Sequence, residues 1–159
     1  MSTVIDWSEI LDPRGRWSPL VHLQASPKVV AQHNSGLAYL ATPYTREVLV
    51  KGKWSLEKSV EFSMLAAREV IMLMRYGVTA VSPIVLAAEG LHAQASNPGT
   101  KVNALDRRRW SDWRRPIFNA ARFVIVPRIS GWDECEAVFS EVEEALARNM
   151  PVFIYGGER

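Results

Sequence analysis

The sequence predicts an α/β fold: a doubly wound, flavodoxin-like parallel sheet of four to five strands, flanked by helices in a three-layer sandwich. Short apolar runs recur along the chain, namely LAYLAT, VTAVSPIVL, RFVIVP and PVFIY. Segments with helical spacing lie between them, so consecutive strands are expected to run parallel, with right-handed crossovers. The 159 residues are enough for one hydrophobic core.

The first 35 residues show no sustained hydrophobic period, and Pro13, Pro19 and Pro27 are scattered through them. We expect an N-terminal arm over residues 1–35 that packs on the domain or on a neighbouring subunit. The α/β domain is then expected over residues 36–159. The tryptophans of the arm also leave open that this is an assembly or interaction protein.

The first strand and the first long helix carry clear end signals. LAYLAT predicts a buried strand that Pro43 ends, and the polar connection PYTREVLVKGKW follows. Ser55 stands where an N-cap belongs, and Gly77 ends the helix LEKSVEFSMLAAREVIMLMRY. The core face of this helix is expected from Leu56, Phe62, Leu65, Ala66, Val70 and Met74.

The second half continues the alternation. VTAVSPIVL predicts a second strand, and AAEGLHAQASNPGTKVNA predicts a long connection of the kind that often forms a functional lid. LDRRRWSDWRRPIFNAA predicts a helix that breaks or restarts at Pro116, because an internal proline costs about 3 kcal/mol. RFVIVP is the third strand, a helix then runs to about Asn149, and PVFIY is the last strand.

In doubly wound sheets, ligands bind beyond the carboxyl ends of the strands. Three segments follow such ends: Thr42-Pro43-Tyr44, Ser82-Pro83, and residues 130–135. Thr42, Tyr44 and Ser82 are therefore candidate substrate contacts. Residues of these types also cap turns and helices, and that alternative remains open.

The segment SGWDECEAVFSEVEEA is rich in carboxylates, and Glu141 differs from the others. At about 100° per residue, Val138 and Val142 belong to one apolar helix face, and Glu141 falls on its border beside Ala137 and Ala145. These small neighbours would leave room for a ligand. The alternative is a boundary glutamate with no chemical role.

In this order along the chain, YLATPY, SPI and GWDECEAVFSEVEEA resemble the nucleoside 2-deoxyribosyltransferase superfamily, and most closely its small uncharacterised bacterial and phage members. The resemblance covers residues 37 to 155. It implies that Glu141 is the nucleophile and that Tyr39 orients Glu141 through its hydroxyl. Within the Gly-Trp motif, it implies that Gly131, Trp132 and Cys135 contact the substrate, with Cys135 standing where relatives hold the sugar or its phosphate.

The resemblance implies cleavage of the N-glycosidic bond of a nucleoside or nucleotide, by hydrolysis or transfer. Two departures leave a non-catalytic nucleotide-binding or sensing domain as the alternative. Ala137 replaces the usual glycine. The aspartate that assists the leaving base is replaced by Arg114, so the nearest candidate acid is Asp112.

The net charge and the motifs of the chain limit the ligands and partners that can be expected. The net charge of +2 is too small to argue for a polynucleotide. The basic stretch RRRWSDWRR is interpreted as a solvated helix face, with phosphate binding as the alternative. We expect a small nucleoside or nucleotide as ligand, and a homo-oligomer. The three histidines and Cys135 lack metal-site spacing, and neither a Walker A string nor GxGxxG occurs, so we expect no metal and no cofactor.

The sequence favours a cytoplasmic protein. MSTVIDWSEILDP has acidic residues and no apolar core, unlike a signal peptide. A single cysteine, Cys135, fits a reducing compartment. No apolar run reaches the length that a bilayer requires, so no membrane is expected as a partner.

Overall fold

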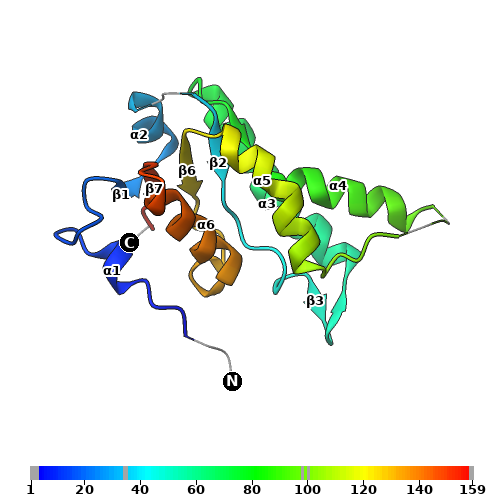
Figure 1. The fold of residues 1–159 in the computed structure, drawn as a ribbon. Coiled ribbons are helices and arrows are strands. Elements are labelled where there is room, and N and C mark those ends of the chain that lie inside the picture. The colour runs from blue at the N-terminus through cyan, green and yellow to red at the C-terminus, as the bar shows by residue number, and fades with distance from the viewer. Residues whose placement is uncertain (1–3, 34–35, 98, 100, 158–159) are drawn as a thin grey trace.

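The computed structural model describes residues 4–33, 36–97, 99 and 101–157, and it has the predicted architecture: a five-stranded parallel sheet flanked by helices, consistent with a flavodoxin-like sandwich (Figure 1). The strand order is β1-β7-β6-β2-β5. The strands are β1 (Val21–Ala25), β2 (Ala38–Leu40), β5 (Ala80–Val81), β6 (Phe123–Val126) and β7 (Val152–Tyr155). A separate antiparallel hairpin is formed by β3 (Leu49–Val50) and β4 (Lys53–Trp54).

Helices cover both faces of the sheet. They are α1 (Ser8–Leu11), α2 (Pro27–Gln32), α3 (Leu56–Arg75), α4 (Pro83–Ala95), α5 (Arg107–Ala120), the 3₁₀ turn η1 (Trp132–Glu134) and α6 (Glu136–Ala147). One core cluster joins α1, α5 and α6 to the sheet side that carries Tyr39 and Val124. A second joins α2 and α3 to the other side, which carries Leu40 and Ile125. A third, around Tyr44, packs α3, α4 and the hairpin.

The chain reverses its direction of winding between β2 and β6. From β2 it crosses to β5 on one side, whereas β6 pairs with the other side of β2 and β7 lies beyond β6. Ala41, just after β2, donates its backbone N–H to the carbonyl of Ile125 in β6. In open α/β sheets such a switch point opens a crevice at the strand carboxyl ends. Thr42 follows β2 at this point.

The N-terminal segment contributes to the sheet as well as packing on it. β1 lies at the sheet edge, with Val21 opposite Val152 of β7, and Trp7 and Ile10 are buried in the core. The sequence analysis assigned no strand here, because VHLQA is only partly apolar and its buried residues are the two at its ends. The expected boundary falls on residues 34 and 35, which lie outside the described residues.

The prediction for VTAVSPIVL was wrong after Val81. The Ser82 hydroxyl accepts a hydrogen bond from the Val85 N–H at 3.2 Å, and Pro83 is the first residue of α4. Proline suits this position because its missing N–H would have no partner inside the helix. The segment AAEGLHAQA, predicted as loop, is therefore the body of α4.

The long helix α3 is confirmed with its end signals, but not with its whole core face. The Lys58 N–H donates to Ser55 Oγ at 3.3 Å, and Gly77 takes a left-handed φ of +79° after the last turn. Phe62 is buried as expected. Leu56 and Met74, however, are 47% and 70% exposed.

The predicted break at Pro116 was also wrong, because α5 runs through it to Ala120. The turn after the proline carries Phe118, which is fully buried in the core, where its ring packs edge-on against Tyr39 of β2. Burying a phenylalanine contributes about 1.5–3 kcal/mol, which offsets most of the cost of the internal proline.

Candidate functional site

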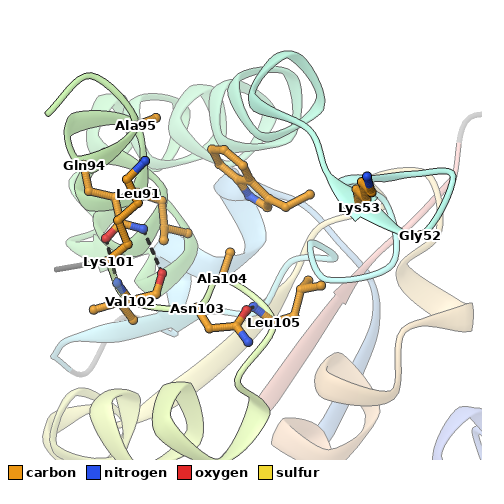
Figure 2. Close-up of a pocket in the computed structure, with 11 residues that line it drawn as sticks. Gly52, Lys53, Leu91, Gln94, Ala95, Lys101, Val102, Asn103, Ala104 and Leu105 are labelled. Atoms are coloured by element: carbon orange, nitrogen blue, oxygen red, sulfur yellow. Dashed lines mark hydrogen bonds between the residues drawn. The ribbon is translucent and has the colours of Figure 1, made fainter. Parts of the chain in front are cut away.

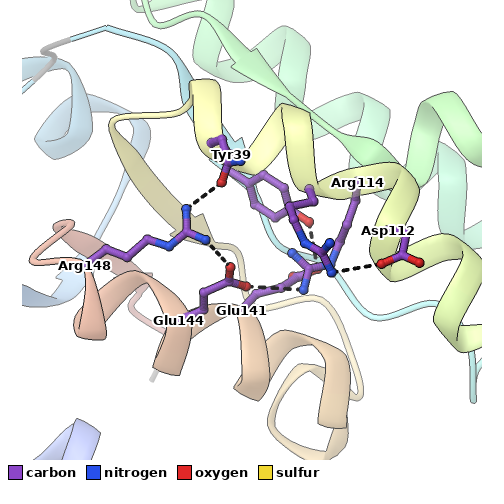
Figure 3. A network of polar contacts seen from close by, with 8 residues as sticks. Tyr39, Asp112, Arg114, Glu141, Glu144 and Arg148 are labelled. Atoms are coloured by element: carbon purple, nitrogen blue, oxygen red, sulfur yellow. Dashed lines mark hydrogen bonds and ion pairs between the residues drawn. The ribbon is translucent and has the colours of Figure 1, made fainter.

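Glu141 is held in the interior by the apolar face of α6. Val138, Val142 and Ala145 on this helix are fully buried against the sheet. Because Glu141 lies one turn before Ala145, its side chain is carried to the edge of the same face, and the residue is only 8% exposed. It points toward β2 and α5 (Figure 3). The predicted border position is therefore a buried carboxylate.

The partner of Glu141 on the sheet is Tyr39. The Tyr39 hydroxyl donates a hydrogen bond of 2.7 Å to Glu141 Oε1, as the resemblance implied, and the tyrosine is 1% exposed. Its ring meets that of Phe118 edge-on at 5.0 Å, which fixes the direction of the hydroxyl. Burial, and then the charge of Glu141, raises the pKa of Tyr39, so that the hydroxyl remains a donor.

Arg114 on α5 is the charge partner of Glu141. Its Nε lies 3.6 Å from Glu141 Oε1, and its terminal nitrogen lies 3.4 Å from Glu144 Oε2. Glu144 also receives a 2.6 Å hydrogen bond from Arg148, and Arg148 bonds to Asn119 (Figure 3). This chain of alternating charges joins α5 to α6. The Arg114 side chain is 19% exposed and lies over the carboxylate.

Burial dominates the ionisation of Glu141. It raises the pKa of this carboxyl to about 7, although the charge of Arg114 and the hydrogen bond from Tyr39 both act to lower it. Glu144 adds to the rise. A carboxyl with a pKa near neutrality is populated in both forms at physiological pH, which is a frequent property of functional groups and also of buried ion pairs.

The structure does not bring Asp112 to Glu141. Its carboxylate is half exposed and pairs with Arg115 at 2.9 Å. Two residues correspond to about 200° around a helix, so Asp112 points away when Arg114 faces Glu141. Arg114 is the α5 residue at the site; from the sequence it was expected to be a departure from the superfamily pattern and part of the solvated basic stretch RRRWSDWRR, but its side chain is only 19% exposed. The general signal is that a buried carboxylate is often paired with an opposite charge, but this does not single out Arg114 among the arginines of α5.

Of the three candidate side chains at the strand ends, Tyr44 and Ser82 have structural partners. The Tyr44 hydroxyl accepts a hydrogen bond from Trp54 Nε1 at 3.0 Å and lies 2.6 Å from Ser59 Oγ, which in turn lies 2.8 Å from His92 Nε2. Ser82 caps α4. These contacts fit the alternative interpretation of strand-end residues as local caps and braces.

Thr42 is different. It is 4% exposed, and its Oγ1 has no hydrogen-bond partner within the described part of the chain. A buried hydroxyl without a partner costs about 1–3 kcal/mol. Such a group at the topological switch point is available to a ligand.

The Gly-Trp motif shapes the loop before α6. Gly131 has a φ of +88°, and a Cβ added there would collide with the carboxylate of Glu47. Trp132 is 9% exposed and packs on the ring of Trp7 at 5.0 Å. Both contacts are structural.

Cys135 begins α6 and is buried. Burial raises the pKa of its thiol; the backbone amides of Val138 and Ala137 act in the opposite direction, and the charge of Glu141 adds to the rise. The thiol makes no capping hydrogen bond to the helix. It is therefore a neutral group near Glu141, suited to lining a site.

Two hollows of about 440 and 400 Å³ lie away from Glu141. The larger is lined by Trp54, Leu91 and the loop 101–105, where the Gln94 amide bonds both the N–H and the carbonyl of Val102 (Figure 2). Neither hollow is lined by Tyr39, Thr42 or Glu141. The Glu141 side chain keeps 11% of its surface exposed, and the Arg114 Nε lies 3.6 Å from its Oε1.

The fold and the site define a doubly wound α/β protein with a buried glutamate, held by a tyrosine and an arginine. Residues 36–157 match the family model described as "Domain of unknown function (DUF1937)", so the chain belongs to this family. A search of curated proteins and a search of solved structures each found no match. Within the described residues no helix is long and apolar enough to cross a membrane, and no three metal-binding side chains gather.

Proposed function

We propose that this protein cleaves the N-glycosidic bond of a nucleoside or nucleotide, as a hydrolase or a deoxyribosyltransferase, with Glu141 as the nucleophile. The observation that carries the proposal is the 2.7 Å hydrogen bond from Tyr39 to Glu141 Oε1. One carboxylate oxygen is fixed by this bond, while no hydrogen bond to Oε2 forms within the described residues. A nucleophile held in one orientation with one oxygen free has the form that attack on a sugar carbon requires.

The chemistry follows that of two-step glycoside cleavage. The ionised carboxylate attacks C1′, the C1′–N bond breaks, and its electron pair goes to the base, which takes a proton from water. Water then attacks C1′ and releases Glu141 with loss of a proton; in transfer, a nitrogen of a second base attacks instead. Because Asp112 points away from Glu141, no carboxylic acid is assigned to the leaving base.

The surroundings favour a nucleotide over a nucleoside. Arg114 lies beside the Glu141 carboxylate, Arg148 bonds to Glu144 on the same helix, and guanidinium groups bind phosphate in a bidentate manner. Exchange of Glu141 for a phosphate as the partner of Arg114 would uncover the nucleophile. The unpartnered hydroxyl of Thr42 would serve the sugar or the base at the switch point.

The test is incubation with 2′-deoxynucleosides and their 5′-monophosphates, with released base measured by liquid chromatography. We expect release by the native chain, more from monophosphates, and none from Glu141→Gln. Glu143→Gln is the matched control, because Glu143 is exposed on the same helix and should keep full activity. Full activity in Glu141→Gln would refute the mechanism.

A second candidate is a nucleotide-binding or sensing domain without turnover. The ion pair between Arg114 and Glu141 favours it, because the cation competes for the carboxylate and covers it. Thermal shift with nucleotides distinguishes the two. Stabilisation without product over a long incubation supports binding alone, and prompt release of base excludes it.

A further inference from the structure

Helix α3 carries apolar side chains on two faces. Its inner face packs Phe62, Ala66 and Leu73 against the sheet and α4. Its outer face carries a second series at alternating spacings of four and three residues: Val60, Met64, Ala67, Ile71 and Met74. This is the spacing of a coiled-coil seam.

The large apolar side chains of the outer series are exposed to solvent. Met64, Ile71 and Met74 are 59%, 58% and 70% exposed, and Val60 is 38% exposed. A groove of about 400 Å³ runs along this face, lined by Met64, Ala67, Arg68, Ile71, Met72 and Arg75. A large, contiguous apolar patch on a protein surface usually marks a site of contact with another protein.

The charges beside this seam identify the partner. Exposed acidic residues, Glu57 and Glu61, flank its N-terminal half, and exposed basic residues, Arg68 and Arg75, flank its C-terminal half. Glu61 already pairs with Lys58, but neither Glu57 nor Arg75 forms an ion pair within the described residues. Such a surface is complementary to itself when two copies lie antiparallel, whereas a parallel arrangement would bring like charges together.

We propose that two copies of this chain associate through the outer face of α3, with the two helices antiparallel. The twofold axis then lies at the level of Ala66. Glu57 of each copy meets Arg75 of the other, and Val60 lies against Ile71. An interface of this kind is isologous and closed, so it yields a dimer and no longer assembly.

The dimer is independent of the proposed chemistry. α3 covers the sheet face opposite α6, which carries Glu141. The measurement that tests it is the molar mass in solution, and this does not depend on any substrate.

The first test is sedimentation of the full chain between about 1 and 100 µM, since association follows mass action. We expect a dimer that dissociates on dilution, and a monomer at all concentrations for Met64→Glu, which buries a charge in the seam. Val4→Glu is the control, because Val4 is 89% exposed and outside α3, and it should leave the dimer intact. A monomeric native chain, or a Met64→Glu variant as dimeric as the native chain, overturns the proposal.

The second test addresses the antiparallel arrangement. Arg75→Glu and Glu57→Arg each place like charges opposite one another at two symmetric positions, and each should weaken dimerisation by about tenfold or more. The double variant restores the pairing and should recover most of the native affinity. Arg108→Glu, an exposed arginine on α5, is the matched control and should change nothing. A double variant no tighter than its parents would overturn the arrangement.

Discussion

The Nε of Arg114 lies 3.6 Å from Glu141 Oε1, so a cation on α5 faces the buried carboxylate of α6. The guanidinium lowers the free energy of the charged carboxylate, yet burial still dominates and raises the pKa of Glu141 to about 7. The charge of Glu141 near neutral pH is therefore set by a balance that single substitutions can shift. The stability of the fold should report that balance directly.

The first prediction concerns the pH dependence of folding. The pKa of Glu141 is raised from 4.5 to about 7, so the folded state binds more protons than the unfolded state between these values. Stability from this group is fully present below pH 4.5 and is lost as the pH rises through 7, by an amount on the order of 3 kcal/mol. Glu141→Gln removes the dependence. Relative to the native chain, it should therefore be more stable at pH 8 than at pH 5.

Urea denaturation of both proteins at the two pH values gives this difference, and other titrating groups cancel in it. Glu143→Gln provides the reference for a surface glutamate and should shift stability equally at both pH values. A constant difference between Glu141→Gln and the native chain would show that the carboxyl titrates normally in the fold.

The second prediction concerns Tyr39→Phe. The hydrogen bond from Tyr39 lowers the pKa of Glu141, so its loss should raise that pKa and move the loss of stability to higher pH. Removing a donor from a buried carboxylate should also cost about 1.5–3 kcal/mol when the carboxylate is charged. Carboxyl ¹³C chemical shifts followed by NMR measure the titration.

Tyr155→Phe is the matched control for Tyr39→Phe. Tyr155 donates an equally short hydrogen bond, 2.7 Å, to Glu69 on α3, far from the site. Its removal should lower stability without moving the titration of Glu141. Equal effects of the two variants on that titration would argue against a specific Tyr39–Glu141 contact.

Much of the fold follows from local signals in the sequence. The Ser55 cap and Gly77 gave the ends of α3, and short apolar runs gave β2, β6 and β7. The border position of Glu141 followed from helical periodicity alone, and Tyr39 came from the resemblance. These features depend on residues close together in sequence, or on one motif.

Other features depend on distant contacts and could not be derived in this way. β1 is a strand because β7 offers it an edge, and α5 continues through Pro116 because this buries Phe118 in the core against Tyr39. The Ser82-Pro83 pair suits a strand end and a helix start equally. The choice between them depends on the tertiary packing of the residues that follow, which form α4. The contact of Arg114 with Glu141 joins two helices and has no local signature.

The third prediction is that the N-terminal segment is indispensable to the fold. Trp7 packs on Trp132 at 5.0 Å and Phe139 at 4.9 Å, and its indole N–H donates to the Asp133 carbonyl at 2.8 Å. Trp7→Ala should therefore cost about 3–5 kcal/mol, as large-to-small changes in a core do. Val4→Ala, at an exposed position, should change stability by less than about 0.5 kcal/mol. Thermal denaturation measures the loss of stability in Trp7→Ala. A small loss would show that the N-terminal segment packs on the domain without being needed for the fold.

The fourth prediction uses the unpartnered hydroxyl of Thr42. Thr42→Val keeps the shape of the side chain and removes a buried group without a partner, so stability should stay constant or rise, by up to about 1–3 kcal/mol. Ser82→Ala, at the neighbouring strand end, should instead lose about 0.5–2 kcal/mol, because Ser82 caps α4. If the Thr42 hydroxyl serves a ligand, thermal shift by deoxynucleoside monophosphates should be smaller in Thr42→Val than in the native chain. A clear loss of stability in Thr42→Val without ligand would mean that the hydroxyl has a partner in the folded protein.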